Sequence, residues 1–195
     1  EIETLLATAR NAAGAQIDFI KTNLIDLAAP ENRQPLLDYQ MSFLRRHPYL
    51  TRIGFGFPDG RLSVAQRDPD NTLKELYSDA GDDMLYEKKL GEELPEASPF
   101  VVTERPWFLK ANEHRRPGWT DVYEFAGSPP QLGVSAFDLI VGDDSEVEVI
   151  ALCDITLGPV DEFLNQLSLT ENGRSAVLEG NGLLIAISRG RSLQQ

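Results

Sequence analysis

The spacing of the apolar residues changes once along the chain, and this change limits the possible folds more than any other feature. Up to about residue 45, apolar side chains recur every three or four positions, as on one face of a helix. They predict a long helix over residues 2–27, followed by Pro30, and a second helix over 33–45 that ends before Pro48. Beyond it, short apolar runs alternate with turn sequences, which is typical of strands.

The first predicted helix carries a continuous apolar stripe, formed by Ile2, Leu5, Leu6, Ala9, Ala13, Ile17, Ile20, Leu24 and Leu27. Two interpretations of this stripe are open. It could pack against the body of its own domain, or it could pack against a partner helix. The small side chains of Ala9, Ala12 and Ala13 would permit close approach of another helix.

The remaining elements are short and follow one another through turns. A hairpin is expected over 50–57 and 62–66, because Pro58-Asp59-Gly60 is a strong turn sequence. Residues 68–104 are predicted to be loop-rich with weak helical patches. The further expected elements are a short helix at 106–112, strands at 119–125, 132–141 and 147–155, a helix at about 158–167, and a hairpin over 175–179 and 183–188. Adjacent strands joined by turns pair antiparallel, so the predicted fold class is α+β, with helices packed on the sheet.

The chain is strongly acidic, with 18 Lys and Arg residues against 31 Asp and Glu residues and a formal charge of −13. Such a charge argues against binding to nucleic acid or to an anionic membrane face, since both require a basic patch. The charge is concentrated in residues 68–104, which hold 3 basic and 11 acidic side chains. A calcium loop that begins at Asp68 is excluded, because Leu73 and Asp79 occupy the positions that need Gly and Glu.

No catalytic, metal-binding or cofactor-binding motif is apparent. The two histidines stand beside arginines, and no Gly-x-Ser-x-Gly, His-Glu-x-x-His or phosphate-loop pattern occurs. The single cysteine, Cys153, lies in an apolar run and is interpreted as a buried structural thiol. Gly54-Phe-Gly56 precedes a turn and not a helix, so it does not indicate a dinucleotide site. We therefore expect a protein that is not an enzyme and that carries neither a metal nor a cofactor.

Residues 100–123 concentrate aromatic side chains around Arg105. The group comprises Phe100, Arg105, Trp107, Phe108, Trp119 and Tyr123. Arg105 precedes the expected short helix, so it could bind a carboxylate bidentately where the first helical amides add favourable dipoles. Aromatic walls would bury the rest of a small ligand, and an Asp across the sheet could bind an ammonium group. The alternative interpretation is an aromatic core with a surface arginine.

The sequence contains the motifs Arg105-Pro-Trp107-Phe108, Trp119-Thr-Asp121-Val-Tyr123, Gly133-Val-Ser-Ala, Leu152-Cys-Asp154-Ile-Thr-Leu and Phe163-Leu164. In their order and spacing they resemble the double Cache (PDC, PAS-like) extracytoplasmic sensor domains of bacteria. The resemblance covers nearly the whole chain. Such domains occur in chemoreceptors, sensor kinases, diguanylate cyclases and adenylate/guanylate cyclases. The resemblance implies a long N-terminal helix followed by a PAS-like antiparallel sheet flanked by helices.

The resemblance also implies roles for individual residues in a ligand pocket. Arg105 and Trp107 match positions that bind a ligand carboxylate, and Tyr123 matches a pocket tyrosine. Asp154 matches the acid that binds a ligand amine. Phe100 and the aromatic residue after Trp107, Phe108, stand where the amino-acid-binding members have tyrosine, and each lacks the hydroxyl donor. The ligand class therefore remains open between amino acids and other small carboxylates.

The resemblance implies a periplasmic module that is anchored to the inner membrane in the full-length protein, binds a small ligand and signals to a cytoplasmic output domain. It divides the chain into a membrane-emergent helix that could form a homodimer (1–34), a membrane-distal PAS-like ligand-binding unit (35–168), and the start of a truncated or degenerate membrane-proximal unit (169–195). Alternatively, the last hairpin completes the first sheet. The competing functional hypothesis is a ligand-free dimerisation or interaction module whose pocket has decayed.

Overall fold

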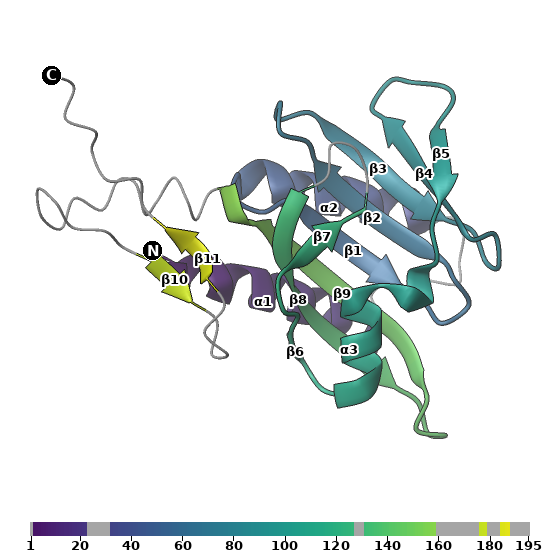
Figure 1. Ribbon diagram of the computed structural model, residues 1–195. Coiled ribbons are helices and arrows are strands. Elements are labelled where there is room, and N and C mark those ends of the chain that lie inside the picture. Colours follow the sequence, from purple (N-terminus) through teal and green to yellow (C-terminus); the bar gives the residue numbers. More distant parts are fainter. Residues whose placement is uncertain (1, 23–31, 127–130, 159–175, 179–183, 188–195) are drawn as a thin grey trace, which may run out of the picture.

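The computed structural model of the chain describes residues 2–22, 32–126, 131–158, 176–178 and 184–187. Its centre is a nine-stranded antiparallel sheet (Figure 1). The strand order is β5-β4-β3-β2-β1-β9-β8-β6, and β7 also pairs with β8. The predicted α+β class, with a long N-terminal helix and an antiparallel sheet flanked by helices, is confirmed.

Two helices precede the sheet in sequence, α1 (Ile2–Lys21) and α2 (Arg33–Arg46). A short meander follows, with β1 (Arg52–Gly56), β2 (Leu62–Arg67), β3 (Leu73–Ser78), β4 (Met84–Lys89) and β5 (Glu96–Pro99). A 3-10 turn, η2 (Val102–Glu104), and the helix α3 (Pro106–His114) cross the sheet. The remaining strands are β6 (Gly118–Trp119), β7 (Tyr123–Phe125), β8 (Gln131–Val141), β9 (Val147–Thr156), β10 (Ala176–Leu178) and β11 (Leu184–Ile187).

Both N-terminal helices form where the helical periodicity predicted them. α2 ends at Arg46, and its C-cap residue His47 leaves the helical conformation because proline disfavours helical backbone in the residue before it. The apolar stripe of α1 faces its own sheet: Ala9, Ala13 and Ile17 are at most 1% exposed and pack against β8 and β9. Of the two interpretations of this stripe, packing within the domain is therefore the one observed. The predicted end of the helix, at residue 27, lies outside the described residues.

The prediction that residues 68–104 are loop-rich is wrong. This segment forms β3, β4 and β5. Its strands lack the usual alternation of apolar and polar residues, because charged side chains occupy buried positions. Lys74 on β3 is 3% exposed and is paired with two carboxylates, and β5 is exposed along its whole length. The stacked rings of Tyr77 and Tyr86, 5.0 Å apart, join β3 to β4. The acidic residues lie mainly at the turns between these strands, where they are solvated.

Apolar side chains are buried on both faces of the sheet, and helices cover both faces (Figure 1). α1 and α2 cover one face, where Ile53, Ala136 and Cys153 pack with the helices. α3 covers part of the other face, where Trp107 and Phe137 pack with the leucines of β2, β3 and β4. Because side chains alternate along a strand, neighbouring residues of β1 and β9 contribute to opposite cores. The face that carries α3 holds the candidate site.

Three further predictions have different outcomes. The expected strand 119–125 is two short strands, β6 and β7, which both pair with β8. The expected hairpin near the C-terminus is present as β10 and β11, which pair with each other in a separate two-stranded sheet. The expected helix over 158–167 lies almost entirely outside the described residues. No helix within the part of the chain that the structure describes is long and apolar enough to span a membrane.

Candidate ligand-binding site

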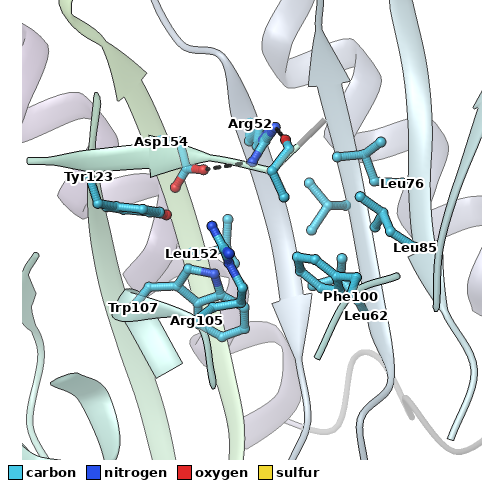
Figure 2. Close-up of a pocket in the computed structure, with 12 residues that line it drawn as sticks. Arg52, Leu62, Leu76, Leu85, Phe100, Arg105, Trp107, Tyr123, Leu152 and Asp154 are labelled. Atoms are coloured by element: carbon cyan, nitrogen blue, oxygen red, sulfur yellow. Dashed lines mark hydrogen bonds and ion pairs between the residues drawn. The ribbon is translucent and has the colours of Figure 1, made fainter. Parts of the chain in front are cut away.

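A pocket opens on the face of the sheet that carries α3. Its lining comes from β1, β2, β3, β4 and β9 on the sheet side, and from the segments around α3 and β7 on the other side. The lining residues are Arg52, Leu62, Val64, Leu76, Leu85, Phe100, Arg105, Trp107, Tyr123, Ala126, Leu152 and Asp154. Figure 2 shows Arg52, Asp154 and Tyr123 toward one end, with Leu76 and Leu85 on the opposite side. The pocket is thus polar at one end and apolar at the other.

The pocket is narrow in this structure. Its cavity measures about 20 Å³, and the whole hollow, which includes space open to solvent, measures about 330 Å³. A cavity of the smaller size holds about one water molecule. A ligand larger than water therefore requires a side chain at the rim to move.

Local sequence positions Trp107 over the sheet. Pro106 is the first residue of α3, where its fixed backbone angle favours a helical start, and Arg105 before it has extended backbone. The Trp107 ring lies directly over Gly56 of β1, and a Cβ atom at that position would overlap the ring. Glycine is therefore required at residue 56 for the indole to reach the sheet. This contact positions the aromatic wall of the pocket.

Arg105 lies across the pocket between two aromatic rings. Its guanidinium carbon is 5.4 Å from the centre of the Phe100 ring and 5.9 Å from that of Tyr123. Its Nη2 donates a hydrogen bond of 3.0 Å to the carbonyl oxygen of Glu124. Arg105 is only half-buried, so it can exchange this carbonyl for a ligand carboxylate at low cost. Of the side chains with charge in the pocket, it is the one best placed to move.

Arg52 and Asp154 form a buried charged pair on the sheet. They are direct neighbours on β1 and β9, and Arg52 Nη1 is 4.0 Å from Asp154 Oδ2. The side chains are 11% and 2% exposed. Arg52 is fixed by further contacts: its Nε donates to Gln66 Oε1 at 2.6 Å, its Nη2 donates to the carbonyl of Ala126, and its guanidinium lies 4.9 Å from the Phe125 ring. At 4.0 Å the ion pair is at the outer limit of direct contact, and Asp154 Oδ1 has no hydrogen-bond partner.

Burial shifts the ionisation of the groups around Asp154. Loss of solvent raises the pKa of Asp154 to about 6, although the charge of Arg52 and a hydrogen bond from Ser135 lower it. Burial also lowers the pKa of the Arg52 guanidinium, and the Asp154 charge opposes that shift. The pKa of Tyr123 is raised, again mainly by burial, with the Asp154 charge adding to the effect. Its hydroxyl is 2.7 Å from Ser135 Oγ. Asp154 is therefore a poorly solvated carboxyl with a free oxygen, and it titrates within reach of neutral pH.

The polar end of the pocket continues across the sheet as a chain of charges and hydrogen bonds. Arg52 contacts Gln66, whose Nε2 donates to Asp68 Oδ1 at 2.7 Å. Lys74 Nζ lies 2.9 Å from Asp68 Oδ1 and 2.6 Å from Glu87 Oε2. Strand register explains the row, because Arg52 faces Gln66 and Gln66 faces Lys74 on successive strands. Arg52 is thus held in place by a row of hydrogen bonds and ion pairs that extends over β2, β3 and β4.

The structure brings together five of the seven residues predicted for the site: Phe100, Arg105, Trp107, Tyr123 and Asp154. The other two do not line the pocket. Phe108 is buried in the core beside it, with its ring 5.7 Å from that of Trp107. Trp119 packs against the core on the opposite face of the sheet. The residues that sequence reasoning missed are Arg52, Leu62, Val64, Leu76, Leu85, Ala126 and Leu152. Most of them lie on β1, β2, β3, β4 and β9, and only the pairing of these strands brings them to one pocket.

Within the described residues, no three His, Cys, Asp or Glu side chains lie close enough to hold a metal ion. Cys153 is buried on the face opposite the pocket, and burial raises the pKa of its thiol well above the usual value. The predicted burial of Cys153 is confirmed.

Comparison with known proteins gives matches in structure only. No protein-family model matches the sequence, and no curated protein matches it at a significant level. Among solved structures, the chain is similar to the sensory domain of the Campylobacter jejuni chemoreceptor Tlp3 (CcmL), with a TM-score of 0.63 and 12% identity over 95% of this chain and 65% of that one. The ligand-binding domain of Tlp3 in complex with L-valine gives a TM-score of 0.61 at 14% identity, over 95% of this chain and 64% of that one.

A second kind of receptor gives the same result. The extracellular domain of soHK1S-Z6, a proposed histidine kinase, matches with a TM-score of 0.59 and 20% identity, over 94% of this chain and 64% of that one. The chain spans less than two thirds of each of these three domains. The chain therefore has the fold of the extracellular sensory domains of chemoreceptors and histidine kinases, which confirms, at the level of the fold, the resemblance that its motifs predicted.

Proposed function

We propose that this chain is the extracytoplasmic sensor domain of a membrane signalling protein and that it binds a small carboxylate or amino-acid-like ligand in the pocket beneath Trp107. The observation that carries the proposal is the convergence of Arg52, Arg105 and the buried Asp154, whose Oδ1 oxygen has no hydrogen-bond partner, at one end of the pocket. Two arginines face one carboxyl there, so a bound anion would balance the remaining positive charge.

The arrangement accommodates a small ligand with a charged head and an apolar body. Arg105 would exchange the Glu124 carbonyl for the ligand's carboxylate, and Trp107 would cover the bound molecule. The leucines of β2, β3 and β4 would contact its apolar part. A structure of the similar Tlp3 domain contains L-valine, a ligand of this general size and chemistry.

Thermal denaturation of the purified chain tests the proposal. We would measure the melting temperature with each of the common amino acids, aliphatic amines and aliphatic carboxylates. A compound at about 100 times its Kd stabilises the folded state by about 2.7 kcal/mol. For a domain of this size that corresponds to a rise of roughly 5–11 °C. Arg105→Ala should abolish the rise, and Arg116→Ala, which removes an exposed arginine elsewhere, should not.

The competing function is a ligand-free interaction module with a decayed pocket, and the small cavity of about 20 Å³ favours it. In that case Arg105 is a structural side chain that holds β7 through Glu124. No compound in the panel would then raise the melting temperature of the wild-type chain, and Arg105→Ala would lower it even without ligand. Binding by wild type and its loss in Arg105→Ala would exclude this alternative.

We also propose the wider architecture that the resemblance implies. The domain is periplasmic, is anchored to the inner membrane in the full-length protein, and controls a cytoplasmic output domain of the cyclase, diguanylate cyclase, kinase or chemoreceptor type. α1 would transmit the signal and could form a homodimer through the side that does not face the sheet. The separate sheet of β10 and β11 supports assigning residues 169–195 to a second unit. Protease accessibility in spheroplasts tests the location, and sedimentation of the chain tests the dimer.

A further inference from the structure

Arg52 gives the pocket a feature that its motifs did not predict. It lies on the central strand β1, its side chain is 11% exposed, and it faces the pocket beside Asp154. Contacts with Gln66, the Ala126 carbonyl and the Phe125 ring hold it there. Unlike Arg105 at the rim, Arg52 cannot leave without breaking several buried interactions. A ligand that enters the pocket therefore meets a fixed cation next to the only acidic side chain among the lining residues that the structure describes.

The charges in the lining favour an anion. Arg52 and Arg105 contribute two positive charges, and Asp154 contributes at most one negative charge. Burial raises the pKa of Asp154 to about 6, so its negative charge is lost as pH falls through that value. A carboxylate with no other charge would match this balance. A zwitterionic amino acid would gain less, because it brings a positive charge as well.

The position of Arg52 also limits where an ammonium group could bind. Asp154 is the acidic acceptor in the lining, and the Arg52 guanidinium lies 4.0 Å from its Oδ2. An ammonium group at Asp154 Oδ1 would therefore stand close to the Arg52 cation in a poorly solvated site, where like charges repel strongly. The neutral oxygen of a hydroxyl group or a water molecule at the same place would not be repelled by Arg52. The free Oδ1 atom can instead accept a hydrogen bond from a hydroxyl group or a water molecule.

We propose that Arg52 is a specificity-determining residue, and that it makes the pocket select small carboxylates with an apolar body and no α-ammonium group over the corresponding amino acids. This inference rests on the proposed function and names its ligand class. Arg105 and Arg52 would share the carboxylate, since both face the polar end of the pocket. Leu62, Val64, Leu76 and Leu85 would contact the hydrocarbon part, which is the same in both members of such a pair.

Titration calorimetry with matched pairs tests the inference on the full chain. The pairs are propionate and L-alanine, isovalerate and L-valine, 4-methylvalerate and L-leucine, and succinate and L-aspartate. Each pair differs only in the α-ammonium group. We expect the wild-type chain to bind the tightest-binding carboxylate of the four pairs at least about tenfold more tightly than the amino acid of the same pair. An amino acid that binds as tightly as its partner, or more tightly, overturns the inference and leaves the proposed function in place.

Two variants separate specificity from folding. Asp154→Asn removes the negative charge that would attract an ammonium group and repel a carboxylate, so carboxylate binding should tighten relative to wild type. Its loss would overturn the inference. Arg52→Gln removes the fixed cation, and we expect the carboxylate preference to fall by about tenfold or more. An unchanged preference in a variant with a wild-type circular dichroism spectrum also overturns it. If no compound of any pair binds to the wild-type chain, the proposed function fails, and the inference fails with it.

Discussion

Asp154→Asn should change how the stability of the domain depends on pH. The pKa of Asp154 is raised from 3.8 to about 6 by burial, so the folded state holds this proton more tightly than the unfolded state. The favourable contribution is complete below the unfolded pKa and is lost as pH rises through the folded pKa. Stability from this group therefore falls between about pH 4 and pH 7.

The size of the effect follows from the shift. One pKa unit corresponds to about 1.4 kcal/mol, so a rise from 3.8 to about 6 corresponds to about 3 kcal/mol. Asparagine has nearly the same shape and does not ionise. The variant should therefore gain about 3 kcal/mol relative to wild type as pH rises across this window. The attraction of Arg52 for the ionised carboxylate is already contained in this shift, because it lowers the pKa that burial raises.

The assay is urea denaturation at half-unit steps of pH, in buffers that contain no carboxylate. The quantity of interest is the difference in unfolding free energy between the variant and wild type. Asp143→Asn, in the exposed turn between β8 and β9, controls for the removal of one acidic side chain at the surface. A difference curve that stays flat between pH 4 and pH 7 would refute the assignment of Asp154 as a poorly solvated carboxyl.

Three other predictions concern the packing around the site. Gly56→Ala should destabilise the domain by about 1–3 kcal/mol, because the added methyl group overlaps the Trp107 ring, and urea denaturation with unchanged stability would contradict this contact. Lys74→Met should cost about 3–5 kcal/mol, because it leaves two largely buried carboxylates without their cation; a loss below about 1 kcal/mol in the same assay would show that they are solvated. Cys153 should react with a thiol reagent only as the domain unfolds, because it is fully buried and its thiolate is disfavoured. Rapid labelling in native buffer would argue against that burial.

Local patterns predicted most of the helices and strands correctly. The helical periodicity of α1 and α2, the turn at Pro58-Asp59-Gly60 and the apolar run of β9 each depend on residues close in sequence. The prediction for 68–104 was wrong because periodicity assumes that buried positions are apolar. In β3 the buried Lys74 is neutralised by carboxylates from other segments, and no local pattern records such a pairing.

The residues of the candidate site likewise include some that local sequence predicts and some that it does not. Arg105, Trp107 and Tyr123 were predicted because they cluster in sequence and match a family pattern. The sequence around Gly56 indicates only that it does not belong to a dinucleotide loop, whereas in the structure its lack of a side chain makes room for Trp107. Trp119 belongs to the same sequence cluster, but it packs on the other face of the sheet. A difference of a few residues across two short strands decides which face a side chain joins.

The sequence by itself determined the fold class, the order of most elements and the aromatic side of the pocket, because these depend on periodicity and on short motifs. Only the tertiary structure decided the charge of the pocket. Arg52 and Asp154 are about 100 residues apart in the chain, and the register between β1 and β9 places them side by side. Since a charge acts through distance in space, the balance between anion and zwitterion is set by that register and not by any local stretch of sequence.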